Sequence, residues 1–314
     1  MSNTTSTKST PDPWNDIKYI ILQTCLIPSI ICSLYTLVRL LFDHNLRTAI
    51  HNHTCLLLLF ISILDAFFNH PLTLNYLRTN HVTPSTDATC LVWNFFNSMF
   101  VVSTYWTMAW GTIEKHILIF APTLLATKRK RFLLHYLPLF LTTFVYPVIA
   151  AMIFILFYPC QNKFDMSSLY CAFPCSLSIR SVALYTRFAH NFIPAFTVVS
   201  ATAILIMRVI KHKRHIRTNR FTWRRYRRMV SQSLSLSSLF LVLTLPATTV
   251  SIVQNCCQAT FAADLQVSVF NFLLRFLTIF MPFICLSSLP EIRPKIRLFN
   301  KTRIRAILTQ RQQN

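Results

Sequence analysis

The sequence of 314 residues contains a single glycine, Gly111, and this absence excludes several kinds of site. Glycine-rich phosphate-binding loops and the Gly-x-Ser-x-Gly nucleophile turn both need more than one glycine, so neither is present. A GxxxG contact between membrane helices is excluded for the same reason. Without these motifs we expect no enzymatic activity and no bound metal.

Acidic residues are also scarce, because nine Asp and Glu stand against 31 Lys and Arg and the formal net charge is +22. In a soluble domain that excess would indicate nucleic-acid binding along a basic groove. Here 53% of the residues are hydrophobic, and the basic residues lie between long apolar stretches. We therefore expect no nucleic-acid partner and predict a membrane protein.

Apolar stretches long enough to cross a bilayer fill most of the chain. A helix of ~20 mostly apolar residues spans ~30 Å of hydrocarbon and satisfies its own backbone hydrogen bonds. The sequence thus predicts an all-α membrane protein, a seven-transmembrane helix bundle over residues 17–289, between an N-terminal segment 1–16 and a tail 290–314. The predicted spans are residues 17–42, 52–77, 90–119, 132–158, 184–210, 226–255 and 265–289.

Most basic residues fall on one side of these spans, in the run 128–131, in the loop 208–228 and in the tail. The positive-inside rule makes that side cytoplasmic, and an odd number of spans then puts the N-terminus outside. We expect a multi-pass protein of the plasma membrane, with the lipid bilayer as its surroundings. Asn3 begins an Asn-Thr-Thr glycosylation acceptor on the outer side.

The third stretch has a cysteine near its start and a charged triplet near its end. At ~1.5 Å per residue, a helix from Cys90 to Glu114 is ~36 Å long, so Cys90 lies at one interface and Glu114-Lys115-His116 at the other. Pro122 follows in the next loop. Later stretches carry Pro194, Phe240 six residues before Pro246, and Pro282.

This layout resembles the rhodopsin-like (class A) G-protein-coupled receptors over nearly the whole chain. The resemblance implies a receptor that binds an extracellular ligand and activates a heterotrimeric G protein, with a short amphipathic eighth helix at 291–299. Departures from the family pattern mark a divergent orphan member. They include Lys115 in place of Arg, His116 in place of Tyr, Leu243-Thr244-Leu245-Pro246 in the sixth span, and Met281-Pro282-Phe283-Ile284-Cys285 in the seventh.

The resemblance also assigns roles to individual residues. The residues implied in G-protein coupling are Glu114, Lys115, His116 and Pro122. The residues implied in an ion site or switch are Asp65, Thr104, Phe240, Pro246 and Pro282, with sodium as the candidate ion near Asp65. The residues expected to line a ligand cavity are Trp93, Asn97, Thr248, Asn271 and Arg275. Because Arg275 is not a lysine, it forms no Schiff base with retinal, and we do not expect light sensing.

Two pairs of charged residues have more than one interpretation. Asp65 and Arg275 lie deep in spans, where an unpaired charge is costly. They form an ion pair with each other, or Arg275 serves an anionic ligand group while Asp65 serves a cation or proton, or the spans are misregistered and neither holds. Glu114 and Lys115 form a local ion pair that a partner protein breaks, or they only mark the end of a span.

Six cysteines lie on the outer side, which allows 15 disulfide connectivities. The resemblance favours Cys90 with Cys171, and Cys160 with Cys175 is a candidate second bond. A zinc site at Cys160, Cys171 and Cys175 is disfavoured because no histidine lies nearby.

Two other functions compete with a coupled receptor. A transporter or channel of odd helix number is one, although the inverted repeats common in transporters are absent. A seven-helix protein that has lost G-protein coupling is the other, which the altered triplet would permit.

Overall fold

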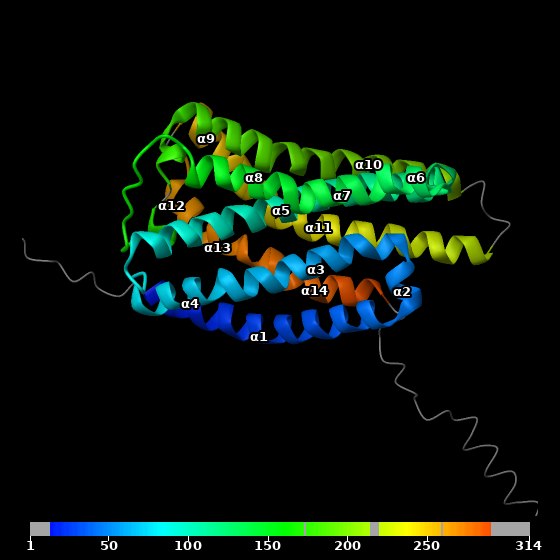
Figure 1. The fold of residues 1–314 in the computed structure, drawn as a ribbon, viewed down its shortest axis with the longest axis horizontal. Coiled ribbons are helices and arrows are strands. Elements are labelled where there is room, and N and C mark those ends of the chain that lie inside the picture. Colours follow the sequence, from blue (N-terminus) through cyan, green and yellow to red (C-terminus); the bar gives the residue numbers. More distant parts are fainter. Residues whose placement is uncertain (1–12, 173, 214–219, 259, 290–314) are drawn as a thin grey trace, which may run out of the picture.

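The computed structural model describes residues 13–172, 174–213, 220–258 and 260–289, which form one bundle of long helices lying side by side (Figure 1). Asn3 and the predicted eighth helix lie outside the described residues. The helices form the predicted seven-helix bundle. Its spans are formed by α1 (Pro13–Phe42), α3 and α4 (Ile50–Phe68 and His70–Thr79), α5 (Asp87–Phe120), a fourth span from α6 (Lys128–Arg131) through η4 (Met152–Leu156), a fifth from α9 (Arg180–Thr186) through α10 (Ile193–Lys213), α11 (Arg220–Cys256), and a seventh from α12 (Ala263–Leu265) through α14 (Arg275–Ser288).

The two ends of the bundle differ in their chemistry. At the left of Figure 1 lie α4, α9 and α12, together with the loop that carries the disulfide cysteines, and we call this the disulfide end. At the right lie α2 (His44–Thr48) and α6, whose sequence is Lys-Arg-Lys-Arg, and we call this the basic end.

Helix α5 differs from the other spans because it is less apolar and carries many buried polar side chains. In the described part of the chain, six helices are long and apolar enough to cross a membrane, and α5 is not among them although it has 34 residues. Its polar side chains, such as Asn94, Thr107 and Glu114, are buried against neighbouring helices. By contrast, α1 exposes large apolar side chains such as Ile20 and Ile31, as a lipid-facing helix does.

Three prolines coincide with wide turns in the fourth and fifth spans. The N–H groups of Leu137, Tyr146 and Ile193 each bond to the carbonyl five residues earlier, in the π-helical turns η2 (Phe132–Tyr136), η3 (Leu141–Val145) and η7 (Arg187–Phe192). A proline follows each of these residues directly. In a regular helix the proline ring clashes with the carbonyl four residues back, and the widened turn moves that carbonyl away from the ring.

The single glycine lies where α5 comes closest to α3. A Cβ atom added to Gly111 would collide with the Thr54 side chain on α3. The absence of a GxxxG motif therefore does not prevent a close helix contact, because one glycine opposite a threonine is enough here.

Candidate functional site

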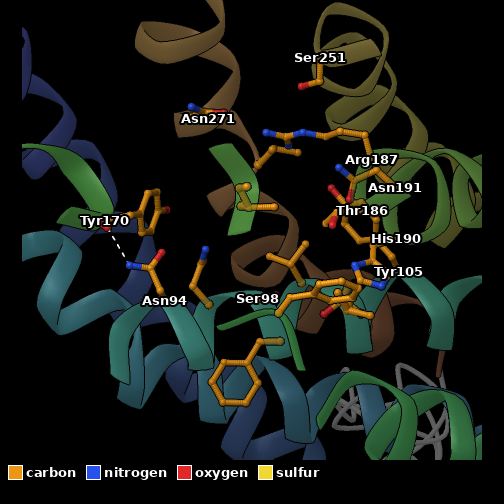
Figure 2. A pocket seen from close by; sticks show the side chains of 18 of the residues that line it. Asn94, Ser98, Tyr105, Tyr170, Thr186, Arg187, His190, Asn191, Ser251 and Asn271 are labelled. Carbon is orange, nitrogen blue, oxygen red and sulfur yellow. Dashed lines mark hydrogen bonds between the residues drawn. The ribbon is translucent and has the colours of Figure 1, made fainter. Parts of the chain in front are cut away.

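A cavity of about 350 Å³ lies among α5, η7, α11, η8 (Gln266–Phe270) and α14, towards the disulfide end (Figure 2). Tyr170 and Ser176, from the loop between the fourth and fifth spans, form part of its wall. Of the residues predicted to line a ligand cavity, Asn97, Asn271 and Arg275 do so, and Asp65 and Thr104 line it as well.

Arg275 is almost fully buried in the wall of this cavity. Its Nη2 donates a hydrogen bond of 3.1 Å to Asn97 Oδ1, and its guanidinium carbon lies 4.5 Å from the centroid of the Tyr170 ring. The amide and the ring face stabilise the cation, but neither carries a negative charge. Arg275 therefore has polar partners but no carboxylate in direct contact, and Asp65 acts on it only from a longer distance.

Asp65 has partners other than Arg275. Its Oδ1 accepts a hydrogen bond of 2.5 Å from Asn69 Nδ2, and its Oδ2 accepts one of 2.8 Å from Thr278 Oγ1. Its ion-pair partner is His70, with Nε2 3.9 Å from Oδ2. The ion pairs among the described residues do not include Asp65 with Arg275, so the first interpretation of this pair is wrong as a direct contact.

The surroundings of Asp65 also bear on the candidate sodium ion. Both carboxylate oxygens already accept hydrogen bonds, and His70 Nε2 is a third polar atom nearby. The buried Thr104 hydroxyl has no hydrogen-bond partner in the described residues, but it is a single neutral oxygen. These groups do not form the open, oxygen-rich shell that a hard cation needs, so the residues around Asp65 do not fit a sodium ion.

Two further ionisable residues in the wall were missed from the sequence. Arg187 and His190 both come from the π-helical turn η7 and line the cavity. His190 is 2% exposed, and neither of its ring nitrogens has a hydrogen-bond partner among the described residues. Both residues lie inside the predicted span 184–210. An ionisable residue inside a membrane span is a candidate functional residue, so the sequence contained enough information to predict both.

Two of the predicted lining residues lie elsewhere. Trp93 is fully buried and packs on Tyr170, with ring centroids 5.0 Å apart, in a cluster with the Cys90–Cys171 disulfide. Trp93 lies one helical turn from Cys90 and packs beside the disulfide on that face of α5. The next residue, Asn94, lines the cavity instead. Thr248 is buried on α11 and does not line the cavity either.

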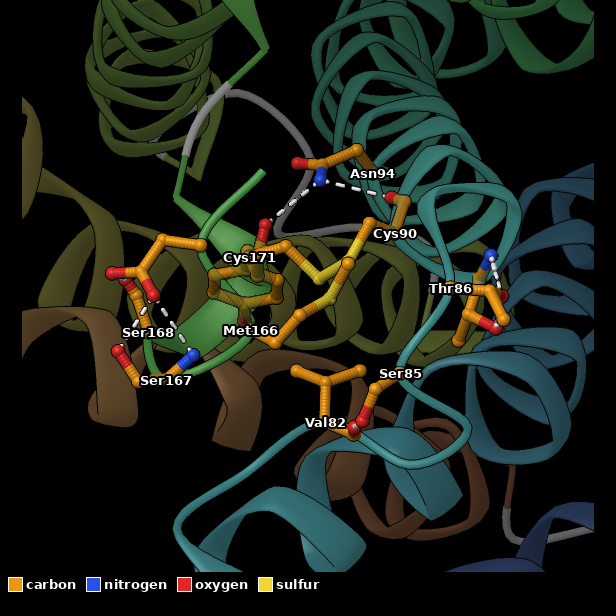
Figure 3. The surroundings of a disulfide bond; sticks show 12 residues. Val82, Ser85, Thr86, Cys90, Asn94, Met166, Ser167, Ser168 and Cys171 are labelled. Atoms are coloured by element: carbon orange, nitrogen blue, oxygen red, sulfur yellow. Dashed lines mark hydrogen bonds between the residues drawn. A yellow bond between two sulfur atoms is a disulfide. The ribbon is translucent and has the colours of Figure 1, made fainter. Parts of the chain in front are cut away.

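The disulfide between Cys90 and Cys171 joins α5 to the loop that covers the cavity (Figure 3). Tyr170, Cys171 and Ala172 all have positive φ, an unfavourable backbone conformation for residues other than glycine. Asn94 Nδ2 holds this segment by donating to the Tyr170 carbonyl at 2.8 Å. The bond and the amide together keep the Tyr170 ring over Arg275. A second disulfide joins Cys160 to Cys175 in the same loop.

Near the basic end, Glu114 is held by residues of two other helices rather than by Lys115. Its Oε1 pairs with His135 Nδ1, and its Oε2 accepts a hydrogen bond of 3.1 Å from Thr54 Oγ1. His135 Nε2 lies 2.7 Å from Nδ1 of His53. We call Thr54, Glu114, His135 and His53 the Glu114 cluster.

The ion pairs of the described residues do not include Glu114 with Lys115, so the predicted local ion pair is wrong. Adjacent helical residues point ~100° apart, which separates the two side chains.

The Glu114 cluster requires one proton beyond those of neutral histidines. His53 Nε2 contacts the Arg47 carbonyl at 2.8 Å, so the three successive contacts from Arg47 to Glu114 need three hydrogens. Two neutral imidazoles supply only two. The third proton lies on an imidazole or on the Glu114 carboxyl, so the cluster has no net charge.

The other predicted coupling and switch residues are spread over this half of the bundle. Lys115 is 5% exposed and lies near Cys55 and Cys285, and His116 Nε2 contacts the Ala201 carbonyl at 2.7 Å. Pro122 begins the short helix η1 (Pro122–Leu125). Phe240 is fully buried with its ring edge-on to Tyr105, while Pro246 and Pro282 lie inside α11 and α14.

Comparison with known proteins agrees with the helix arrangement. The crystal structure of squid rhodopsin superposes with a TM-score of 0.69 over 90% of this chain and 85% of that chain, at 18% sequence identity. No protein-family model matches the sequence, and no curated protein matches it either. The likeness establishes the fold, which is a seven-helix membrane bundle like that of squid rhodopsin.

Proposed function

We propose that this protein is a receptor that binds a ligand from outside the cell in the cavity and changes its interaction with a heterotrimeric G protein at the basic end. The observation that carries the proposal is the cavity itself. It lies under a disulfide-tethered loop, its wall contains polar groups without hydrogen-bond partners, and it opens among helices that extend to the opposite end. A rhodopsin-like fold supports the same assignment.

Transmission to the basic end requires two states of the bundle with different affinity for the ligand and for the G protein. The coupling residues in this proposal are Glu114, Lys115, His116 and Pro122. Because Lys115 is buried, its amine contacts a partner only in a state in which the helices around it have moved. The Glu114 cluster, which ties α5 to α3 and to the fourth span, opposes that movement.

Loss of G-protein coupling is the second candidate function. It is favoured by the burial of Lys115 and by the pairing of Glu114 with His135, since both leave the triplet without a free charge at the surface. A transporter or channel finds no comparable support in the arrangement of these residues.

Nucleotide exchange separates the two candidates. The full chain in lipid nanodiscs is mixed with each class of heterotrimeric G protein, and the rate of GTP-analogue uptake is measured with and without a ligand library. A coupled receptor accelerates exchange, and Lys115→Ala abolishes the acceleration while Lys128→Ala, in the exposed basic run, does not. No acceleration with any G protein, including for a Lys115→Arg variant, supports the uncoupled protein.

The topology is part of the proposal. It places the N-terminus and the disulfide end outside the plasma membrane and the basic end in the cytosol. Epitope tags at both termini test it, because an odd number of spans puts the N-terminal tag alone within reach of antibodies on intact cells. Removal of a glycan by a glycosidase, and its loss in an Asn3→Gln variant, tests Asn3 as its attachment site.

A further inference from the structure

We infer that the cavity takes an amphiphilic organic anion, whose carboxylate is held between Arg187 and Arg275 and whose apolar body lies against α5. The inference rests on the proposed function in that it treats the cavity as the ligand site. It adds the charge and the shape of the ligand.

The charges that face the cavity do not balance within the protein. Its wall contains two guanidinium groups, from Arg187 and Arg275, and one carboxylate, from Asp65. Asp65 is engaged by Asn69 and Thr278, and the described residues place no carboxylate within 4.0 Å of either arginine. A buried cation without a counter-ion is costly, and an anion that enters the cavity removes that cost.

Arg187 is placed to meet such an anion. It comes from the π-helical turn η7, and Figure 2 shows its side chain extending across the cavity towards Asn271. No hydrogen bond or ion pair joins it to another described residue. A planar guanidinium presents two parallel N–H donors, which match the two oxygens of a carboxylate.

His190 supplies a second, independent sign of a missing ligand. Its ring is almost fully buried among Tyr146, Phe154 and Tyr185, and it lines the cavity with both nitrogens lacking hydrogen-bond partners in the described part of the chain. Buried polar groups are nearly always satisfied, so an unsatisfied imidazole at a cavity wall indicates a ligand or water acceptor. The same anion, one turn from Arg187, can accept its N–H.

The rest of the wall limits the body of the ligand. Apolar residues that include Phe100, Val102, Ile155 and Leu277 form most of it, and the volume of about 350 Å³ is at the low end of the ~300–1,000 Å³ typical of pockets for small organic ligands. An inorganic anion would leave this apolar surface uncovered. A monocarboxylate with a compact aromatic or alkyl body satisfies the arginines and fills the space.

Binding to the purified full chain tests this inference without a G protein. The probes are phenylalkanoates of increasing chain length and naphthylacetate, each beside its primary amide and its primary amine, with the protein in nanodiscs of zwitterionic lipid. We expect the carboxylates to raise the unfolding temperature and to bind with measurable affinity, while the amides and amines bind at least about 10-fold more weakly.

The variants assign the effect to the two arginines. Arg187→Gln and Arg275→Gln should each weaken carboxylate binding by about 30-fold or more. Arg180→Gln, at the exposed start of α9 and seven residues from Arg187, is the matched control and should bind as the wild type does. Arg187 has no described hydrogen bond or ion pair, so we expect Arg187→Gln to fold like the wild type. Arg275→Gln loses the contacts of Arg275 and is the variant more prone to misfold. The unfolding temperature of each variant without ligand measures the difference.

The inference is overturned if no carboxylate binds, if the amides or amines bind as tightly as the carboxylates, or if both arginine variants bind like the wild type. Its failure is distinguishable from failure of the receptor function. Nucleotide exchange driven by a cationic or neutral ligand would keep the receptor and reject the anion. Carboxylate binding without nucleotide exchange would keep the anion site and reject the receptor function.

Discussion

The cavity and the Glu114 cluster are both polar regions inside one bundle, but their polar groups are satisfied in different ways. In the Glu114 cluster each charge meets a partner from another helix, and the contacts run without a gap from the Arg47 carbonyl to Thr54. In the cavity Arg187 and His190 face open space. A closed polar network holds helices together, whereas an open one is available for a ligand.

The difference gives each region a separate role. Removing one member of the Glu114 cluster leaves a buried group without its partner, so the main effect falls on stability. Removing Arg187 takes away a group with no described hydrogen bond or ion pair, so the main effect falls on binding. Variants that act against this division are the most informative.

Breaking the pair between Glu114 and His135 should have the largest effect. His135→Leu leaves the buried Glu114 carboxyl without the imidazole that pairs with it, and we expect a loss of about 3–5 kcal/mol in the free energy of unfolding. Unfolding by SDS in mixed micelles measures it. The double variant Glu114→Met with His135→Leu should recover most of the loss, because no buried carboxyl then remains without its partner. Wild-type stability in the single variant would show that the cluster does not hold the helices.

The disulfide between Cys90 and Cys171 tests how the cavity is covered. Replacing both cysteines by serine should cost about 2–5 kcal/mol and release Tyr170 from Arg275. The matched control replaces Cys160 and Cys175, which are 15 residues apart rather than 81 and do not include a cysteine of α5. The same SDS titration compares the two, and an equal or larger loss in the control would contradict this account of the loop.

Gly111→Ala tests the close contact of α3 with α5. The added methyl group collides with Thr54, which donates to Glu114, so we expect a loss of about 1–3 kcal/mol from overpacking. Adding Thr54→Ser to Gly111→Ala removes the methyl group that clashes and keeps the hydroxyl donor. Recovery in that double variant, measured by thermal unfolding, confirms the steric cause, and no recovery contradicts it.

A small pH effect is expected in the loop at the disulfide end. The Ser167 hydroxyl and then the Ser167 backbone N–H bond to Asp165 and lower the pKa of this carboxyl below its usual 3.8. Because the folded pKa is the lower one, the bonds stabilise the loop above about pH 4 and the stabilisation is lost as pH falls through the folded pKa. Unfolding temperatures between about pH 5 and pH 3 should fall slightly more for the wild type than for Asp165→Asn. An equal fall in the unfolding temperature of the wild type and of Asp165→Asn would contradict a role of the Asp165 hydrogen bonds in stability.

The sequence predicted the bundle because its signals are local. A run of ~20 apolar residues needs no knowledge of its neighbours to be recognised as a membrane span. Proline also acts locally, because it lacks the N–H that a regular helix needs, and three prolines follow π-helical turns in the structure. The candidate site was predicted only in part, since Asn97, Asn271 and Arg275 line the cavity and Trp93 and Thr248 do not.

The errors share a physical cause, which is that the direction of a side chain depends on how its helix is rotated against its neighbours. Trp93 and Asn94 are adjacent, yet one packs beside the disulfide and the other lines the cavity. Glu114 and Lys115 are adjacent as well, and Glu114 pairs with His135 instead. No spacing rule within one helix identifies a partner on another.

The sequence by itself determined that the chain is a bundle of membrane-spanning helices with its basic residues at one end, because apolar length and loop charge act on each segment separately. Only the tertiary structure decided which polar groups meet. Helix rotation and widened turns bring His135 to Glu114, carry Arg187 and Arg275 to one cavity, and leave the two arginines there without a carboxylate partner among the described residues.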